Sequence, residues 1–105
     1  MSDIHKLDKA FENRVRLGIM TTLMVEDSMD YNGLKTGLEV SDGNLASHLK
    51  ALEAEQYIEV FKSFLGRKPN TTYKITKLGR KAFEVHLNAL EQLIGNMSDF
   101  RKSKK

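Results

Sequence analysis

The 105-residue sequence has no cysteine, no tryptophan, a single proline and no long hydrophobic run. Without cysteine, the chain can form neither disulfides nor thiolate metal sites. No apolar stretch approaches the ~20 residues that a transmembrane helix needs, and the N-terminus shows no signal-peptide pattern, so we expect a cytoplasmic protein. The length predicts a single domain over residues 1–100, followed by a basic, disordered tail at residues 101–105.

Residues that commonly support catalysis are also scarce. The three histidines, His5, His48 and His86, lie far apart and lack the spacing of metal ligands. There is no cysteine nucleophile and no glycine-rich phosphate loop. These absences predict that the protein is not an enzyme, with no catalytic residues, no metal site and no cofactor.

Acidic side chains are missing from a long central stretch. The formal net charge is +3, but the last five residues alone carry +4, which leaves residues 1–100 at −1. Between Glu59 and Glu84 there is no Asp or Glu, and the basic residues there are Lys62, Arg67, Lys68, Lys74, Lys77, Arg80 and Lys81. Such an excess of one sign is the electrostatic footprint of a nucleic-acid-binding surface, although a merely solvated cationic face has the same composition.

The stretch from Ser41 to Leu52 predicts a short amphipathic helix, extending over about residues 42–54, with a small and polar outer face. Ser41 is a good N-cap residue. The apolar stripe consists of Leu45, Leu49 and Leu52, at spacings of four and three. The opposite side carries Gly43, Asn44, Ser47 and Lys50, and small hydrogen-bonding groups suit close approach to base edges. A shorter helix over residues 32–38 precedes it, so the pair has the form of a helix-turn-helix.

From residue 57 the pattern changes to strand, turn and strand. Tyr57–Phe64 and Thr71–Ile75 are β-rich and alternate in polarity, and the Gly66–Asn70 segment between them is a turn cluster. A hairpin over about residues 57–75 is therefore predicted, with Arg67 and Lys68 at its tip. A hairpin directly after a helix-turn-helix is a wing. The predicted fold class is mostly α with a small β-hairpin (α+β), a winged helix-turn-helix.

Helical patterns flank this unit on both sides. Residues 3–26 have helical periodicity with a break near Asn13, and residues 77–98 predict a long C-terminal helix with heptad spacing. Its apolar face is wider than a monomer of this size readily buries, which predicts a homodimer. The predicted dimer interface is Ile4, Leu7, Phe11, Phe83, Leu87, Leu90, Ile94 and Met97. In the alternative, the last helix folds onto the N-terminal helix of its own chain.

Several segments resemble a known family, namely Asp42–Leu49, Gly66–Pro69 and Tyr73–Arg80. They are similar to winged helix-turn-helix transcriptional regulators of the MarR/ArsR kind, especially the short stand-alone prokaryotic winged helix DNA-binding domains. The resemblance runs from about Asn13 to Phe83. It implies a homodimer with each recognition helix in a major groove and each wing near the flanking minor groove. The cysteine pair of metal-sensing ArsR proteins and the long flanking helices of full MarR proteins are not found here, so no effector is carried over.

We therefore predict a transcriptional regulator, a repressor, that binds a pseudo-palindromic operator in double-stranded DNA as a homodimer. The alternatives are a winged-helix protein–protein interaction module without DNA binding, and RNA binding. The predicted base-reading residues are Gly43, Asn44 and Ser47. The predicted backbone-contacting residues are Ser41, Lys50, Arg67, Lys68 and Lys74. For His48 we expect packing or a bond to a backbone group.

Overall fold

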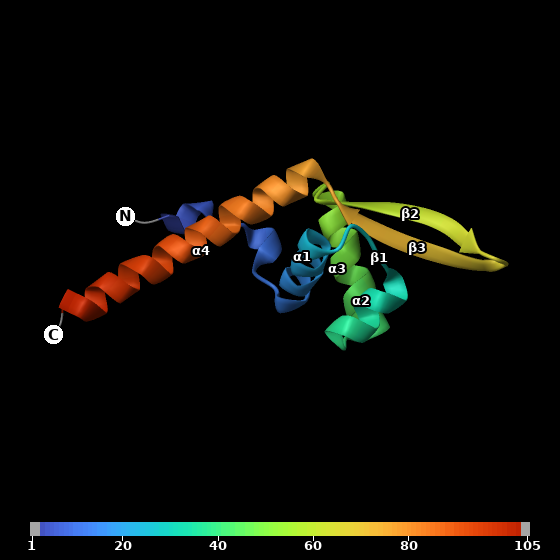
Figure 1. Ribbon diagram of the computed structural model, residues 1–105, viewed down its shortest axis with the longest axis horizontal. Helices are drawn as coiled ribbons and strands as arrows, with labels where there is room; N and C mark the ends of the chain where they lie inside the picture. The colour runs from blue at the N-terminus through green and yellow to red at the C-terminus, as the bar shows by residue number, and fades with distance from the viewer. Residues whose placement is uncertain (1–2, 104–105) are drawn as a thin grey trace.

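The structure is a computed structural model that describes the backbone of residues 3–103 and the side chains of residues 4–95. Two short 3-10 helices lead into three α-helices, a hairpin and a long last helix (Figure 1). The elements are η1 Asp3–Lys6, η2 Lys9–Phe11, α1 Arg14–Val25, β1 Met29–Asp30, α2 Tyr31–Leu38, α3 Asp42–Ala54, β2 Ile58–Leu65, β3 Lys68–Ile75 and α4 Lys77–Ser103. The antiparallel sheet has the order β1-β3-β2, which confirms a winged helix α+β fold.

The N-terminal region is interrupted where polar side chains take up backbone N–H groups. The Asp8 carboxylate accepts from the N–H of Ala10 at 2.9 Å, at the start of η2. The Asn13 side-chain oxygen accepts from the N–H groups of Val15 and Arg16, at 2.8 and 3.3 Å. Each bond satisfies a donor that lacks a partner within the helix and fixes where that helix begins. The break expected near Asn13 is confirmed, but residues 3–12 form two 3-10 turns instead of an α-helix.

The helix-turn-helix has a cap at the start of each helix. Asp30 accepts from the N–H of Gly33 at 2.7 Å and begins α2. At the end of α2, Glu39 adopts the left-handed conformation with φ 55°, and this conformation turns the chain sharply. Ser41 then accepts from the N–H of Asn44 at 3.3 Å and begins α3.

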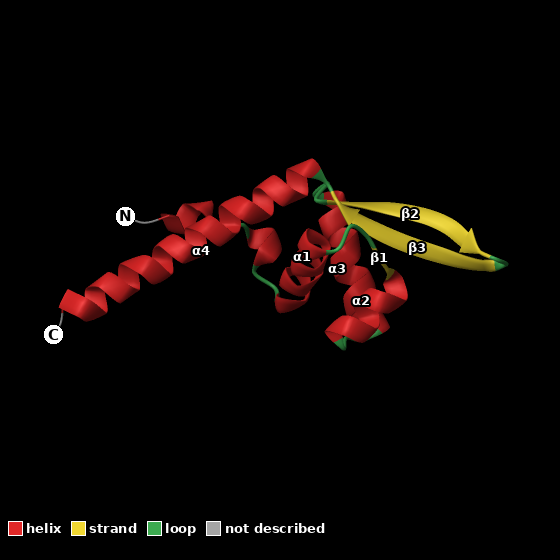
Figure 2. Ribbon diagram, viewed as in Figure 1, coloured by secondary structure: helices red, strands yellow, loops and turns green. Residues whose placement is uncertain are grey.

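The hairpin has a tighter turn than the sequence suggested (Figure 2). The expected turn over residues 66–70 is wrong, because Lys68 pairs with Leu65 and Pro69 pairs with Phe64 in the β2–β3 ladder. Only Gly66 and Arg67 form the loop, and Gly66 takes the positive φ of +65° that a type II′ turn requires at its first central position. Pro69 is tolerated in a strand because β1 pairs with β3 only at residues 72 and 73, so β3 is an edge strand at Pro69.

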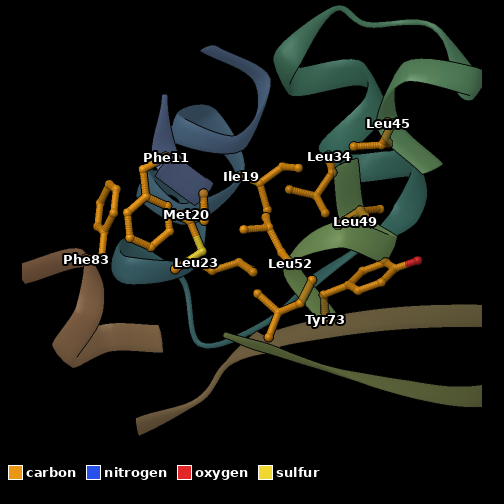
Figure 3. Packing of buried hydrophobic residues seen from close by; sticks show 12 residues of the cluster. Phe11, Ile19, Met20, Leu23, Leu34, Leu45, Leu49, Leu52, Tyr73 and Phe83 are labelled. Carbon is orange, nitrogen blue, oxygen red and sulfur yellow. The ribbon is translucent and has the colours of Figure 1, made fainter. Parts of the chain in front are cut away.

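The core lies where α1, α3 and the base of the sheet meet (Figure 3). Its fully buried residues are Phe11, Phe83, Ile19, Met20, Leu23, Leu34, Leu45, Leu52 and Ile58. Phe11 and Phe83 pack edge to face with ring centroids 5.1 Å apart. Both were expected at the dimer interface, and this expectation needs correction. Their exposures of 0% and 2% place them inside the core of a single chain, where they connect the N-terminal segment to α4.

The last helix extends away from the body of the molecule, opposite to the hairpin (Figure 1). The extents of 64 × 25 × 21 Å reflect these two projections. A disordered tail was expected over residues 101–105; the backbone of α4 continues to Ser103, and residues 104 and 105 lie outside the described residues. The face of α4 turned toward its own chain carries Ala82, Phe83, His86 and Ala89, whereas Val85, Leu87 and Ile94 are exposed. Part of the apolar face is thus covered by the chain's own residues, η1 among them.

Candidate nucleic-acid interface

The two sides of α3 differ as the sequence pattern predicted. Leu45, Leu49 and Leu52 are buried, with exposures of 0%, 3% and 0%. The outer face is exposed and carries Gly43, Asn44, Ala46, Ser47 and Lys50. At Gly43, an added Cβ would meet none of the described atoms within 4 Å. The helix therefore presents a narrow face of small groups that another surface can approach closely.

A cluster of three side chains fixes the start of α3 against α2. The Tyr31 hydroxyl lies 3.2 Å from both the backbone carbonyl and the carboxylate of Asp42. The Lys35 ammonium forms an ion pair with the same carboxylate at 3.1 Å. Hydrogen bonds from Lys35 and then Tyr31 lower the pKa of Asp42. The carboxylate at the start of the helix thus stays ionised and partly neutralised, in a position suited to the helix dipole.

The orientation of α3 is also fixed against α1. The Arg16 Nε–H donates to Nδ1 of His48 at 3.0 Å, and His48 is half-buried. Burial, followed by the neighbouring Arg16 charge, lowers the pKa of His48. The imidazole therefore accepts from Arg16 in its neutral form. We expected packing or a bond to a backbone group; the ring is half-buried, but its hydrogen-bond partner is the Arg16 side chain.

An open groove of about 570 Å³ lies between α3 and the hairpin. Ala46, Ser47 and Lys50 line it from α3, and Lys62 and Thr71 line it from the hairpin. Glu53 and Tyr31 also contribute to the lining. Both lysines are exposed, so two ammonium groups border one groove beside the small face of α3.

The hairpin does not bring every expected cation to this side. Side chains alternate between the two faces of a strand, so Lys62 shares the face of Val60, whereas Lys74, which pairs with Glu59, lies on the reverse face. There the Lys74 ammonium lies 5.8 Å from the centre of the Phe61 ring. Lys68, the first residue of β3, is exposed and pairs with Leu65, so it also lies on the reverse face, and Arg67 is exposed in the turn. The structure therefore separates Lys74 from the groove.

The base of the hairpin is tied to the N-terminal segment and to α4. The Tyr57 hydroxyl donates to the Asp8 carboxylate at 2.7 Å, and the Asp8 N–H donates to Nδ1 of the buried His86 at 3.0 Å. Burial first, and then the Asp8 hydrogen bond, raise the pKa of Tyr57 to about 12. A Cβ at Gly79 would overlap the Tyr57 carbonyl oxygen, so only glycine allows α4 to begin this close to the hairpin.

Sequence reasoning missed several of these residues. Lys62 could have been found, because period-two alternation places it on the same face as Val60. Tyr31, Arg16 and Tyr57 gave no local signal, since their partners lie 11, 32 and 49 residues away. Among the predicted site residues, Gly43, Asn44, Ser47 and Lys50 lie together on α3, and Ser41 is its N-cap.

No group of three or more His, Asp or Glu side chains is placed to hold a metal ion within the part of the chain that the structure describes. Over the same residues, no helix combines the length and the apolar character needed to cross a membrane.

Comparison with known proteins gives consistent matches. The sequence profile of the winged helix DNA-binding domain matches residues 15–94. An uncharacterised protein of Methanocaldococcus jannaschii is 37% identical over 89 residues, which cover 85% of this chain and 97% of that protein. The structure of a transcriptional regulator homologue from Pyrococcus horikoshii superposes with a TM-score of 0.76 at 30% identity, covering 84% of this chain and 87% of that one.

The same fold occurs in a more distant regulator. An ArsR family transcriptional regulator superposes with a TM-score of 0.57 at 17% identity, covering 90% of this chain and 97% of that chain. The profile and the Pyrococcus horikoshii structure support a DNA-binding transcriptional regulator, and they confirm the resemblance drawn from the sequence. The chain belongs to the winged helix DNA-binding domain family.

Proposed function

We propose that the protein is a homodimeric transcriptional repressor that binds a pseudo-palindromic operator in double-stranded DNA. The observation that carries this proposal is the arrangement of charge around α3. The outer face of the helix is small and exposed, and the adjoining groove is bordered by Lys50 and Lys62. A helix of this kind fits a major groove, and the flanking cations fit the phosphates beside it.

Within this proposal, the exposed polar residues of α3 read bases. Asn44 suits the N6 and N7 atoms of adenine, and the Ser47 hydroxyl can either donate or accept. Gly43 lets the start of α3 approach the DNA closely, because it has no side chain and the space around its Cα is open. The Ser41 oxygen accepts as the helix cap, which leaves its hydroxyl hydrogen free to donate to a phosphate oxygen.

Cations of the groove and the hairpin supply affinity. Lys50 and Lys62 border the groove, and Arg67 and Lys68 are exposed at the hairpin tip. Ammonium and guanidinium contacts to phosphates hold a protein in register on the duplex without reading sequence. In this arrangement α3 discriminates between sequences, and the hairpin binds the backbone.

The dimer is proposed from the apolar side chains that α4 and η1 leave exposed. Leu87 and Ile94 on α4 are 41% and 66% exposed, and Ile4 on η1 is 52% exposed. Leu90 lies between them and is half-buried, whereas the side chain of Met97 lies outside the described residues. Pairing of two copies along α4 would cover this strip and place two α3 helices on one side of a duplex. Occupancy of an operator is sufficient to block polymerase, so repression is the simplest form of regulation.

Selection from a pool of random duplexes tests this function. After several rounds of binding and amplification, the retained duplexes should share an inverted repeat whose half-site centres lie about one helical turn, ~34 Å, apart. Asn44→Ala should relax the preference at one position of each half-site. If the pool binds but stays random, the protein is not sequence-specific. If no duplex is retained, the winged-helix protein–protein interaction module becomes the better account.

A further inference from the structure

The outer half of the hairpin carries large apolar side chains that the chain leaves in solvent. All residues of β2 from Phe61 to Leu65 are exposed. Phe64 is 70% exposed and Leu65 is 65% exposed. Pro69, also exposed, pairs with Phe64 across the β2–β3 ladder. Large apolar groups grouped on a projecting element are typical of a binding surface.

The ladder shows which way this pair faces. Residues opposite each other in an antiparallel pair lie on the same face, and alternate residues along a strand share that face. Phe64 and Pro69 therefore share a face with Lys62 and Thr71, which line the groove beside α3. Leu65 lies on the reverse face. The Phe64–Pro69 pair thus continues the wall of the groove outward, on the side that α3 presents to DNA.

The reach of the hairpin matches the geometry of a duplex. Phe64 lies four residues beyond Val60, which is ~14 Å along a strand. The minor groove lies half a helical turn, ~17 Å, from the adjacent major groove. If α3 occupies a major groove and Lys62 lies at the intervening phosphates, a pair this far along the hairpin would lie close to the next minor groove.

The positive charge around the Phe64–Pro69 pair indicates which kind of partner this apolar surface binds. Arg67 and Lys68 are the next residues at the tip of the hairpin, Lys68 on the reverse face with Leu65, and residues 60–83 include no acidic side chain. Two copies meeting tip to tip would bring these cations together, so self-association is opposed by repulsion. A polyanion is the complementary partner, and the groove beside α3 already directs the hairpin toward duplex DNA.

We propose that Phe64 and Pro69 form an apolar wedge that enters the minor groove, partly unstacks a base step and bends the DNA. The proposal rests on the DNA-binding function proposed above. Phe and Pro are among the side chains with which minor-groove proteins kink a duplex, by roughly 20–90°. The protein would then shape its operator as well as occupy it.

The test separates binding from bending. A selected operator duplex is labelled with a donor and an acceptor dye at its two ends, with 2-aminopurine in the flanking minor-groove segments. Fluorescence anisotropy reports binding, energy transfer reports bending, and 2-aminopurine fluorescence reports unstacking. The wild-type protein should increase both energy transfer and 2-aminopurine fluorescence on binding. Phe64→Ala should still bind, but with both increases lost.

Leu65→Ala is the matched control, because Leu65 is similarly exposed on the reverse face of the hairpin. This variant should bend the duplex as the wild type does. Since both side chains are largely exposed, neither substitution should change the unfolding temperature, which circular dichroism checks. Binding without bending by the wild type, or undiminished bending by Phe64→Ala, would overturn the wedge and leave the DNA-binding function intact. Absence of any binding by the wild type would overturn both proposals.

Discussion

At the scale of single residues, a substitution at Gly43 should change the stability of the fold and the affinity for DNA in opposite directions. A glycine within a helix costs about 0.5–1 kcal/mol relative to alanine, and a Cβ at this position meets open space. Gly43→Ala should therefore raise the free energy of unfolding by up to ~1 kcal/mol and weaken operator binding, because the added methyl lies on the side that we propose to face DNA. Urea unfolding and fluorescence anisotropy measure the two effects.

Gly37→Ala is the control for this substitution. Gly37 lies in α2, and a Cβ there also meets none of the described atoms within 4 Å. Its replacement should raise stability in the same way and leave the affinity unchanged. Equal affinities for both variants and the wild type would show that Gly43 does not approach the DNA.

The raised pKa of Tyr57, at the base of the hairpin, predicts how the free energy of unfolding depends on pH. Its pKa is raised from the ordinary 10.0 to about 12, first by burial and then by the Asp8 hydrogen bond. A raised pKa in the folded state stabilises the fold below pH 10, and this contribution is lost as the pH rises toward 12. The free energy of unfolding of the wild type should therefore fall relative to that of Tyr57→Phe across this range.

Urea unfolding of both proteins at several pH values measures this difference. Tyr31 and Tyr73 also have raised pKa values, mainly because of burial, but they are present in both proteins and cancel in the comparison. Parallel pH curves for the two proteins would contradict the assigned role of Tyr57.

Features set by neighbouring residues could be predicted from the sequence, whereas contacts between residues distant in the sequence could not. The cap at Ser41 and the break near Asn13 are properties of a few neighbouring residues, so their residue types already indicate them. The Asp8–His86 bond joins residues 78 positions apart. A sequence pattern contains no information about such a pair until the fold brings its members together.

At the scale of elements, the two faces of the hairpin should differ in DNA binding. Lys62 lines the groove beside α3, whereas Lys74 lies on the reverse face. Lys62→Ala should weaken binding to all sequences alike and reduce the log–log salt slope by about one per half-site. Lys74→Ala, which removes the same charge, should leave the slope unchanged. Equal losses for both variants would mean that the hairpin contributes only a general positive field.

The boundaries of helices and strands could be predicted where the periodicity of apolar side chains was strong. They were harder to predict where a residue type, such as proline, occurs both in turns and in edge strands. The sequence pattern places Pro69 in the turn, but β1 is short and leaves β3 unpaired on one side at this position, which allows a proline in the ladder. The heptad spacing of α4 correctly indicated a long helix. It could not show that Phe83 packs inside its own chain while Ile94 is exposed, because both belong to the same row.

At the scale of the whole molecule, the proposed dimer depends on the exposed strip of α4. Ile94→Asp should yield a protein with the mass of one chain in light scattering, because a carboxylate opposes burial in an apolar interface. Leu78→Asp is the control at the other end of α4, where a leucine is also exposed, and this variant should remain a dimer. A single-chain mass for the wild type at micromolar concentration would contradict the dimer.

The most direct test of the central claim is the salt dependence of binding to duplex DNA. Fluorescence anisotropy of a labelled random-sequence duplex, titrated at several salt concentrations, gives the slope of log affinity against log salt. A dimer that contacts ~6–8 phosphates should give a slope of about −5 to −7. An absence of binding at ~50 mM salt, where such contacts are strong, would contradict the assignment of α3 and the hairpin to DNA.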